Sequence, residues 1–145
     1  MMICTRHVDP DDERDTLLNL NWMIFGDTAP RIEPEEGEWW IAYDGDPREH
    51  VVVGFGGCRT ARGDEKALYL CRAGVVPAYR GLGIQRKLIK ERERFARAHG
   101  YERVITDCTS DNIASANTLI KTGFKLWKPP HPWAFATSLY WKKEL

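Results

Sequence analysis

The segment Val75–Leu88 holds the residues whose types and spacing most clearly indicate chemistry. An apolar run ends at Pro77, Gly81 and Gly83 follow, and an amphipathic stretch begins. The first amides of a helix have no partner inside the helix and carry partial positive charge, and glycines let a bulky anion approach them. The spacing therefore predicts a diphosphate site where a strand turns into a helix, although an ordinary tight turn would use the same glycines.

The elements that would position this segment follow from the alternation of apolar and turn-forming residues. We expect a helix that starts within 9–13 and further helices at 83–99 and 112–122. We expect strands at 2–6, 39–43, 51–58 and 67–76, from 104, and at 124–127 and 134–141. Turns at 44–47 and 62–65 join three of these strands into an antiparallel meander, and 26–37 reads as a loop or broken helix. The order β-α-β-β-β-α-β-α-β-β predicts an α/β (α+β) fold: a mixed, mostly antiparallel sheet with helices on both faces.

The composition bounds the class of protein. The chain has 145 residues, and 43% hydrophobic with 29% charged residues is typical of a single globular domain over residues 1–145. Lysine plus arginine equals aspartate plus glutamate, 21 against 21, so we expect no nucleic-acid partner. No apolar run reaches membrane-spanning length and the N-terminus has no apolar signal core, so we expect no membrane partner and a cytoplasmic location.

The cysteines predict free thiols in a reducing compartment rather than a metal centre. They are widely spaced, form no C-x-x-C pair and have no histidine at metal-ligand spacing. Cys108 follows a strand and has no recognisable base beside it, so we interpret it as structural rather than nucleophilic. The four residues are Cys4, Cys58, Cys71 and Cys108.

The glycine-bearing segment resembles the acetyl-CoA-binding motif of the GNAT N-acetyltransferase family, Arg/Gln-x-x-Gly-x-Gly/Ala. Here it reads Arg80-Gly81-Leu82-Gly83-Ile84-Gln85, after a Val-x-Pro-x-Tyr similar to the family's. Downstream, Asp111–Ser115 and Lys121–Phe124 resemble the family's second cofactor segment, an Asn at the start of a helix that ends in Lys-x-Gly-Phe. The resemblance covers about residues 50–127 and implies the GNAT-like acyl-CoA N-acyltransferase fold, whose element order is the one expected above.

The resemblance also implies which residues hold acetyl-CoA. Val75 and Val76 would offer backbone groups to the pantetheine arm, and amides from Arg80 to Gln85 would hold the diphosphate. Basic side chains beside the loop would meet phosphate oxygens. Asn112 would bond the pantetheine arm or cap its helix, and both roles stay open. We interpret most of the charges from Lys90 to Arg97 as surface pairs on a solvated helix face. The implied cofactor-binding residues are Val75, Val76, Arg80, Gly81, Leu82, Gly83, Ile84, Gln85, Arg86 and Asn112.

Three positions depart from the family pattern. Gln85 stands where the family has Gly or Ala, Leu119 where many members have a tyrosine that protonates the leaving thiolate, and Ala67 where some have a catalytic glutamate. On the strand that holds Ala67, Glu65 and Tyr69 share its face and are the nearest carboxylate and hydroxyl. They are our candidate catalytic residues, acting through a water; the alternative is that Glu65 is solvated and Tyr69 only packs.

The segment Lys128–Trp133 is a proline-stiffened loop between the last two strands. In the resembling family this loop often forms a wall of the acceptor pocket, which implies that Trp133 contacts the acceptor. His131 is a candidate base there, and the alternative is a solvated loop histidine.

These observations lead to two hypotheses. The first is an N-acetyltransferase in which a primary amine attacks acetyl-CoA directly in a ternary complex. The second is a non-catalytic acyl-CoA-binding or regulatory module, which the missing glutamate and tyrosine keep open. The expected partners are acetyl-CoA and an amine acceptor, either a small molecule or a protein amine, and the chain would be a monomer or a homodimer.

Overall fold

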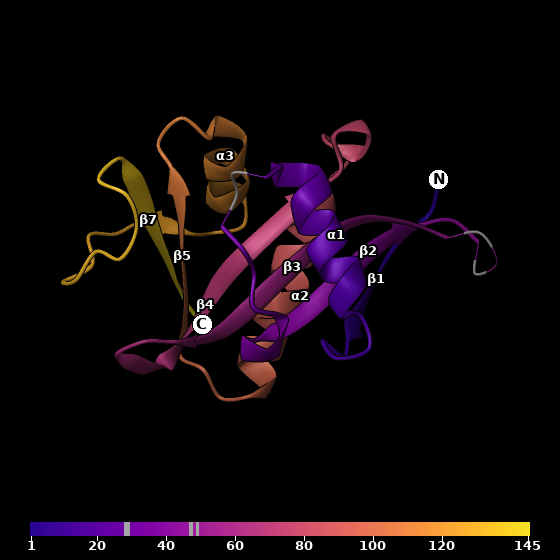
Figure 1. Cartoon of the computed structure of the whole chain (residues 1–145). Coiled ribbons are helices and arrows are strands. Elements are labelled where there is room, and N and C mark those ends of the chain that lie inside the picture. The colour runs from indigo at the N-terminus through magenta and orange to yellow at the C-terminus, as the bar shows by residue number, and fades with distance from the viewer. Residues whose placement is uncertain (28–29, 47, 49) are drawn as a thin grey trace.

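The computed structural model describes residues 1–27, 30–46, 48 and 50–145, which form a seven-stranded sheet flanked by helices (Figure 1). The helices are α1 (Arg14–Phe25), α2 (Ile84–Ala98) and α3 (Ile113–Lys121), and short 3₁₀ turns are η1 (Pro34–Glu36) and η2 (Pro77–Tyr79). The strands are β1 (Ile3–Val8), β2 (Glu38–Asp44), β3 (Val51–Ala61), β4 (Asp64–Val75), β5 (Arg103–Thr109), β6 (Lys125–Leu126) and β7 (Ser138–Glu144). This confirms the predicted order of helices and strands.

The sheet is mostly antiparallel, as expected, with strand order β1-β2-β3-β4-β5-β7-β6. Strands β1 to β4 form the meander, and β7 lies antiparallel to both β5 and β6. The parallel pair is β4 with β5, because α2 carries the chain back to the starting edge before β5 begins. This pair separates the sheet into a meander half and a C-terminal half.

Helices cover the two faces unequally (Figure 1). Leu17 and Leu20 of α1 pack with Trp39 and Phe55 on one face. On the other face, α2 and α3 pack against a larger cluster that contains Trp40, Leu68 and Trp141 among its buried residues. Gly74 lets the end of α1 approach β4, since a Cβ there would lie 3.0 Å from side-chain atoms of Ile24 and Phe25.

Element boundaries differ from expectation mainly near the C-terminus. The last strand starts at Ser138 rather than 134, because the amide of Ala134 donates to the Tyr140 hydroxyl (2.9 Å) instead of to a neighbouring strand. The strand predicted at 124–127 shrinks to Lys125–Leu126. The expected turn at 44–47 and loop at 26–37 lie partly outside the described residues, at Pro47 and at residues 28 and 29.

Most of the charges between Lys90 and Arg97 were predicted to form surface pairs, and Arg92 is an exception because it is only 2% exposed. Its side chain lies under β3, where Nη1 donates to the Gly57 carbonyl (3.0 Å) and Nε to the Leu88 carbonyl (3.1 Å). The arginine fits because Gly56 has no side chain. Surface pairs on α2 do form between Arg94 and Glu91 and between Arg97 and Glu93.

No helix in ranges 1–27, 30–46 and 50–145 is both long and apolar enough to cross a membrane. No group of three or more histidine, cysteine, aspartate or glutamate side chains in those ranges is arranged to hold a metal ion. Cys58 and Cys108 are buried thiols, whereas Cys4 and Cys71 are partly exposed.

Candidate functional site

Strands β4 and β5 pair over three positions and then separate (Figure 1). The pairs run from Ala67 with Arg103 to Tyr69 with Ile105. Where the strands part, the Thr106 hydroxyl donates to the Leu70 carbonyl (2.9 Å) in place of a backbone bond. The β5-facing edge of β4 beyond Tyr69 is thus left without a partner strand, so its backbone groups can bond a ligand.

A groove of about 590 Å³ continues this gap, a size typical of small-molecule sites. It lies between the end of β4, the loop that leads into α2, and the start of α3, and the end of α1 closes one side. Its lining residues are Ile24, Phe25, Ala73, Gly74, Val75, Tyr79, Arg80, Gly81, Gly83, Ile84, Gln85, Arg86, Ile89, Asn112, Ala114, Ser115, Thr118 and Lys121.

The loop before α2 presents free amides to this groove. Gly81 and Gly83 have φ of +79° and +80°, which other residues adopt with strain, and a Cβ on either would meet no atom within 4 Å. The first helical hydrogen bond runs from the Lys87 amide to the Gly83 carbonyl (3.1 Å), so the amides of the preceding turn have no helical acceptor. An open cradle of amides at a helix N-terminus suits a diphosphate.

Most of the residues predicted to hold the cofactor line this groove. They are Val75, Arg80, Gly81, Gly83, Ile84, Gln85, Arg86 and Asn112. Leu82 and Val76 are not among its lining residues. The Val76 amide donates to the Val53 carbonyl (2.8 Å), so this amide is not available to a pantetheine arm.

Two of these side chains already have partners within the protein. The Arg80 Nε donates to the Val75 carbonyl (3.2 Å), which ties the loop back to the end of β4. Asn112 caps α3, because its Oδ1 accepts from the Ser115 amide (3.1 Å). Asn112 lines the groove and the cap leaves its Nδ2 donors unused, so capping and ligand binding are compatible.

Asp107 is the residue that sequence reasoning missed. It lies on β5 two residues beyond Ile105, where the strands separate. Its Oδ2 accepts from the Tyr69 hydroxyl (2.7 Å) and from Trp133 Nε1 (2.8 Å). Among the described residues no donor is bonded to its other oxygen, Oδ1. The sequence feature that could have identified Asp107 is the alternation of side chains along β5, which puts Asp107 on the same face as Ile105 and opposite to buried Cys108.

Tyr69 is held as a protonated donor. Burial raises its pKa, and the neighbouring Asp107 carboxylate adds to this effect. The ring of Trp133 meets the Tyr69 ring edge-on at 5.7 Å between centroids, which places the loop at 127–137 beside this pair. The hydroxyl can therefore orient the carboxylate but is not itself a base near neutral pH.

The remaining catalytic candidates do not join this cluster. Glu65 is exposed at the start of β4, four residues from Tyr69, which is about 13 Å along a strand. His131 is exposed and forms no hydrogen bond within the described part of the chain. Ala67 and Leu119 are buried core residues.

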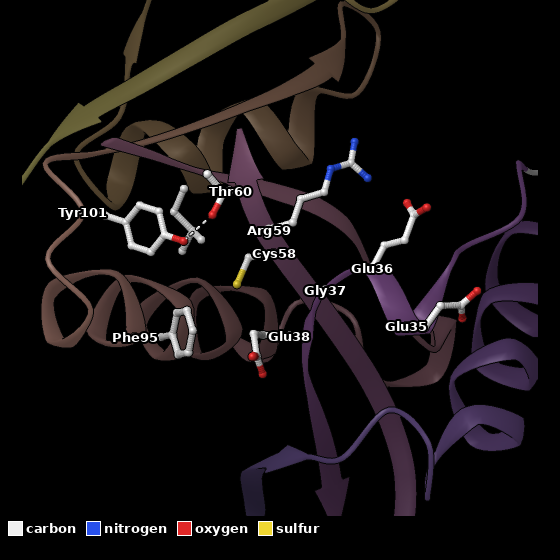
Figure 2. Close-up of a pocket in the computed structure, with 10 residues that line it drawn as sticks. Glu35, Glu36, Gly37, Glu38, Cys58, Arg59, Thr60, Phe95 and Tyr101 are labelled. Atoms are coloured by element: carbon white, nitrogen blue, oxygen red, sulfur yellow. Dashed lines mark hydrogen bonds between the residues drawn. The ribbon is translucent and has the colours of Figure 1, made fainter. Parts of the chain in front are cut away.

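A second cavity of about 290 Å³ lies elsewhere, near the start of β2 (Figure 2). It is bordered by acidic residues of η1 and β2, and by Thr60, whose hydroxyl is hydrogen-bonded to that of Tyr101. Figure 2 shows the Cys58 and Arg59 side chains leaving β3 in opposite directions. Its labelled lining residues are Glu35, Glu36, Gly37, Glu38, Cys58, Arg59, Thr60, Phe95 and Tyr101.

Comparison with known proteins identifies the family. The sequence matches the acetyltransferase (GNAT) family over residues 3–124. The chain therefore belongs to the GNAT acetyltransferase family, as the glycine-bearing motif indicated. No curated protein matches the sequence significantly.

Solved structures share this fold over nearly the whole chain. Arabidopsis thaliana NAA60 in complex with a bisubstrate analogue has 19% identity and a TM-score of 0.77, with 99% of each chain covered, and it was also solved with acetyl-CoA. An IAA acetyltransferase from Bacillus cereus ATCC 14579 has 15% identity and a TM-score of 0.76, covering 99% of this chain and 100% of that one. The ribosomal-protein-S18-alanine N-acetyltransferase from Escherichia coli has 11% identity and a TM-score of 0.72, covering 99% and 94%. These similarities confirm the predicted GNAT fold.

Proposed function

We propose that the protein is an N-acetyltransferase that moves an acetyl group from acetyl-CoA to a primary amine by direct attack in a ternary complex. The observation that carries the proposal is the gap between β4 and β5, which has an amide-lined groove at one end and the Asp107–Tyr69 pair at its base. Family membership and the acetyl-CoA complex of the similar NAA60 structure support the choice of donor.

The donor would bind along this gap. The free amides before α2 would hold its diphosphate, since they are aligned donors at the positive end of a helix. The unpaired edge of β4 would hydrogen-bond the amides of the pantetheine arm, as a further strand would. Gln85 and Asn112 would add side-chain donors from the two walls of the groove.

Asp107 would be the proton acceptor for the incoming amine. An ammonium group would give one proton to the free Oδ1, while Tyr69 and Trp133 hold Oδ2 and fix the carboxylate. The neutral nitrogen would then form a bond to the thioester carbonyl carbon, and the carbon–sulfur bond would break. The leaving thiolate would take the second proton of that nitrogen, so the products are an acetamide and CoA thiol.

This mechanism needs neither the family's usual glutamate nor its usual tyrosine. The carboxylate comes from β5 instead of β4, and a thiolate is a fair leaving group without a positioned acid. Holding both substrates in one gap would supply a large part of the rate, on the order of 7–11 kcal/mol for well-oriented reactants.

The test is release of free CoA from acetyl-CoA with a panel of primary amines, together with calorimetric binding of acetyl-CoA. We expect binding, and turnover with at least one amine that Asp107→Asn strongly reduces. If acetyl-CoA binds but no amine releases CoA above the rate of hydrolysis, the alternative of a non-catalytic acyl-CoA-binding module is correct.

A further inference from the structure

Two arginines beside the Tyr69–Asp107 pair lack carboxylate partners. Arg72 follows the irregular pairing of β3 with β4, and Arg59 lies on the neighbouring strand. Neither guanidinium forms an ion pair with an aspartate or glutamate among residues 1–27, 30–46, 48 and 50–145. A half-buried arginine elsewhere shows the contrast: Arg103 pairs with Asp64 at 2.7 Å and with two further carboxylates.

Arg72 is partly buried and weakly bonded. Its guanidinium stacks over the Phe25 ring, 4.6 Å from the centroid, and its hydrogen bond to the Pro30 carbonyl is long at 3.5 Å. Burial lowers its pKa. Arg72 lies three residues beyond Tyr69 on β4, and the Phe25 ring on which it stacks lines the groove. Most of its donors are thus available to a ligand beside the groove.

Arg59 lies over the ring of Tyr69. Its Cζ is 5.2 Å from the Tyr69 centroid, and its Nε is buried without an acceptor. Glu35 and Glu36 border the same cavity (Figure 2), but Glu35 is paired with Arg14 and neither reaches Arg59. A buried guanidinium nitrogen without an acceptor is costly, so a ligand that supplies one would be favoured.

We propose that the acceptor is an amino acid, a small molecule that carries a carboxylate close to its amine. This inference rests on the proposed function and names the substrate class of the same site. Asp107 takes the amine, and Arg72, with Arg59 beyond Tyr69, takes the carboxylate, because guanidinium groups bind carboxylates in a planar, two-bonded geometry. Phe25 and Trp133, 36% and 42% exposed, flank the site and favour an apolar side chain.

The experiment compares acceptors that differ only in the carboxylate. CoA release is measured with L-phenylalanine, L-leucine and glycine, and with the methyl ester and amide of each. We expect kcat/KM to be at least about tenfold higher for the free acids, the loss typical of one charge-assisted bond. Arg72→Gln and Arg59→Gln should lower kcat/KM at least about tenfold more for the acids than for the esters, which a difference in amine pKa cannot produce. Arg62→Gln, in the β3–β4 turn, is the matched control and should keep the wild-type ratio.

A binding measurement separates this inference from the proposed function. The CoA complex is titrated with N-acetyl-L-phenylalanine and with its methyl ester, which requires no turnover. Tighter binding of the acid, weakened at least tenfold by Arg72→Gln, supports the carboxylate site even if no amine is acetylated. Turnover of esters or simple amines at rates equal to those of the acids overturns the amino-acid inference while the N-acetyltransferase stands. Thermal unfolding and acetyl-CoA affinity must match wild type in each variant.

Discussion

The guanidinium of Arg92 lies against the backbone of Gly56. A Cβ on Gly56 would be 3.0 Å from Cζ and 3.1 Å from Nε of Arg92, closer than side chains normally approach. Two carbonyl bonds and the surrounding core hold the arginine in place, so it has little freedom to move aside. The absence of a side chain at one position on β3 thus makes room for a buried positive charge on α2.

We therefore expect Gly56→Ala to lower the free energy of unfolding by about 1–3 kcal/mol, the usual cost of overpacking a core. The measurement is urea unfolding. The control is a double-mutant cycle with Arg92→Met, because methionine is flexible and would yield to the added methyl group. Equal costs of Gly56→Ala in the two backgrounds would show that the arginine is not what excludes a side chain there.

Asp107→Asn should reduce kcat by about 10²–10⁴-fold, the contribution of a positioned base. The loss should shrink as the pH approaches the pKa of the acceptor amine, because a neutral amine needs no proton acceptor. The measurement is kcat against pH at saturating acetyl-CoA. A loss that is the same at every pH would assign Asp107 a positioning role instead.

Tyr69→Phe should cost less than a hundredfold in kcat, because the hydroxyl orients Asp107 and stays protonated while burial keeps its pKa raised. Glu65→Gln, at the exposed start of β4, should leave kcat unchanged. The measurement is kcat of both variants from steady-state kinetics. Unchanged affinity for acetyl-CoA is the control that each variant is folded. A ten-thousandfold loss in either variant would make that residue the catalytic group.

Gly83→Glu should abolish acetyl-CoA binding, because it places a carboxylate and bulk against the amides that would hold the diphosphate. Gln85→Ala should bind acetyl-CoA within about tenfold of wild type, a change of roughly 1.4 kcal/mol, because the backbone amides carry most of the contact. Calorimetric titration measures both, and binding should also raise the melting temperature of the wild type. Unchanged affinity in Gly83→Glu would place the donor elsewhere.

Alkaline pH should destabilise the fold partly through Cys58. Burial raises the pKa of this thiol from 9.0 to about 12, so the folded state keeps the proton that the unfolded chain loses above pH 9. The contribution of Cys58 to the free energy of unfolding is full below about pH 9. Above that pH it falls by about 1.4 kcal/mol per pH unit until the pKa of the folded state is reached. Unfolding free energies of wild type and Cys58→Ala between pH 8 and 11 measure this, and parallel curves would contradict it.

The sequence was sufficient for the order of elements and for the groove. Gly81 and Gly83 marked the loop, and most of the residues predicted to hold the cofactor line the groove, because local sequence largely determines local backbone geometry. The hydrogen bond from the Val76 amide to the Val53 carbonyl could not be predicted, because it depends on the register between β3 and β4.

Asp107 and Arg92 show why the rest was missed. The hydrogen bond from Tyr69 to Asp107 joins residues 38 positions apart, and it exists because the two strands separate just there. Nothing local distinguishes Arg92 from its solvated neighbours on α2. Its burial depends on glycines of β3, so only the packed structure places it inside.

The separation of β4 and β5 also has a mechanical side. The two halves of the sheet, one with α1 and the other with α3, are joined by a short ladder of three residue pairs between β4 and β5, from Ala67–Arg103 to Tyr69–Ile105. Acetyl-CoA bound in the gap would contact both halves of the sheet and restrict their movement relative to each other. Amide hydrogens along the open edge of β4 would then exchange more slowly with solvent in the complex, because the bound substrate takes the place of a partner strand.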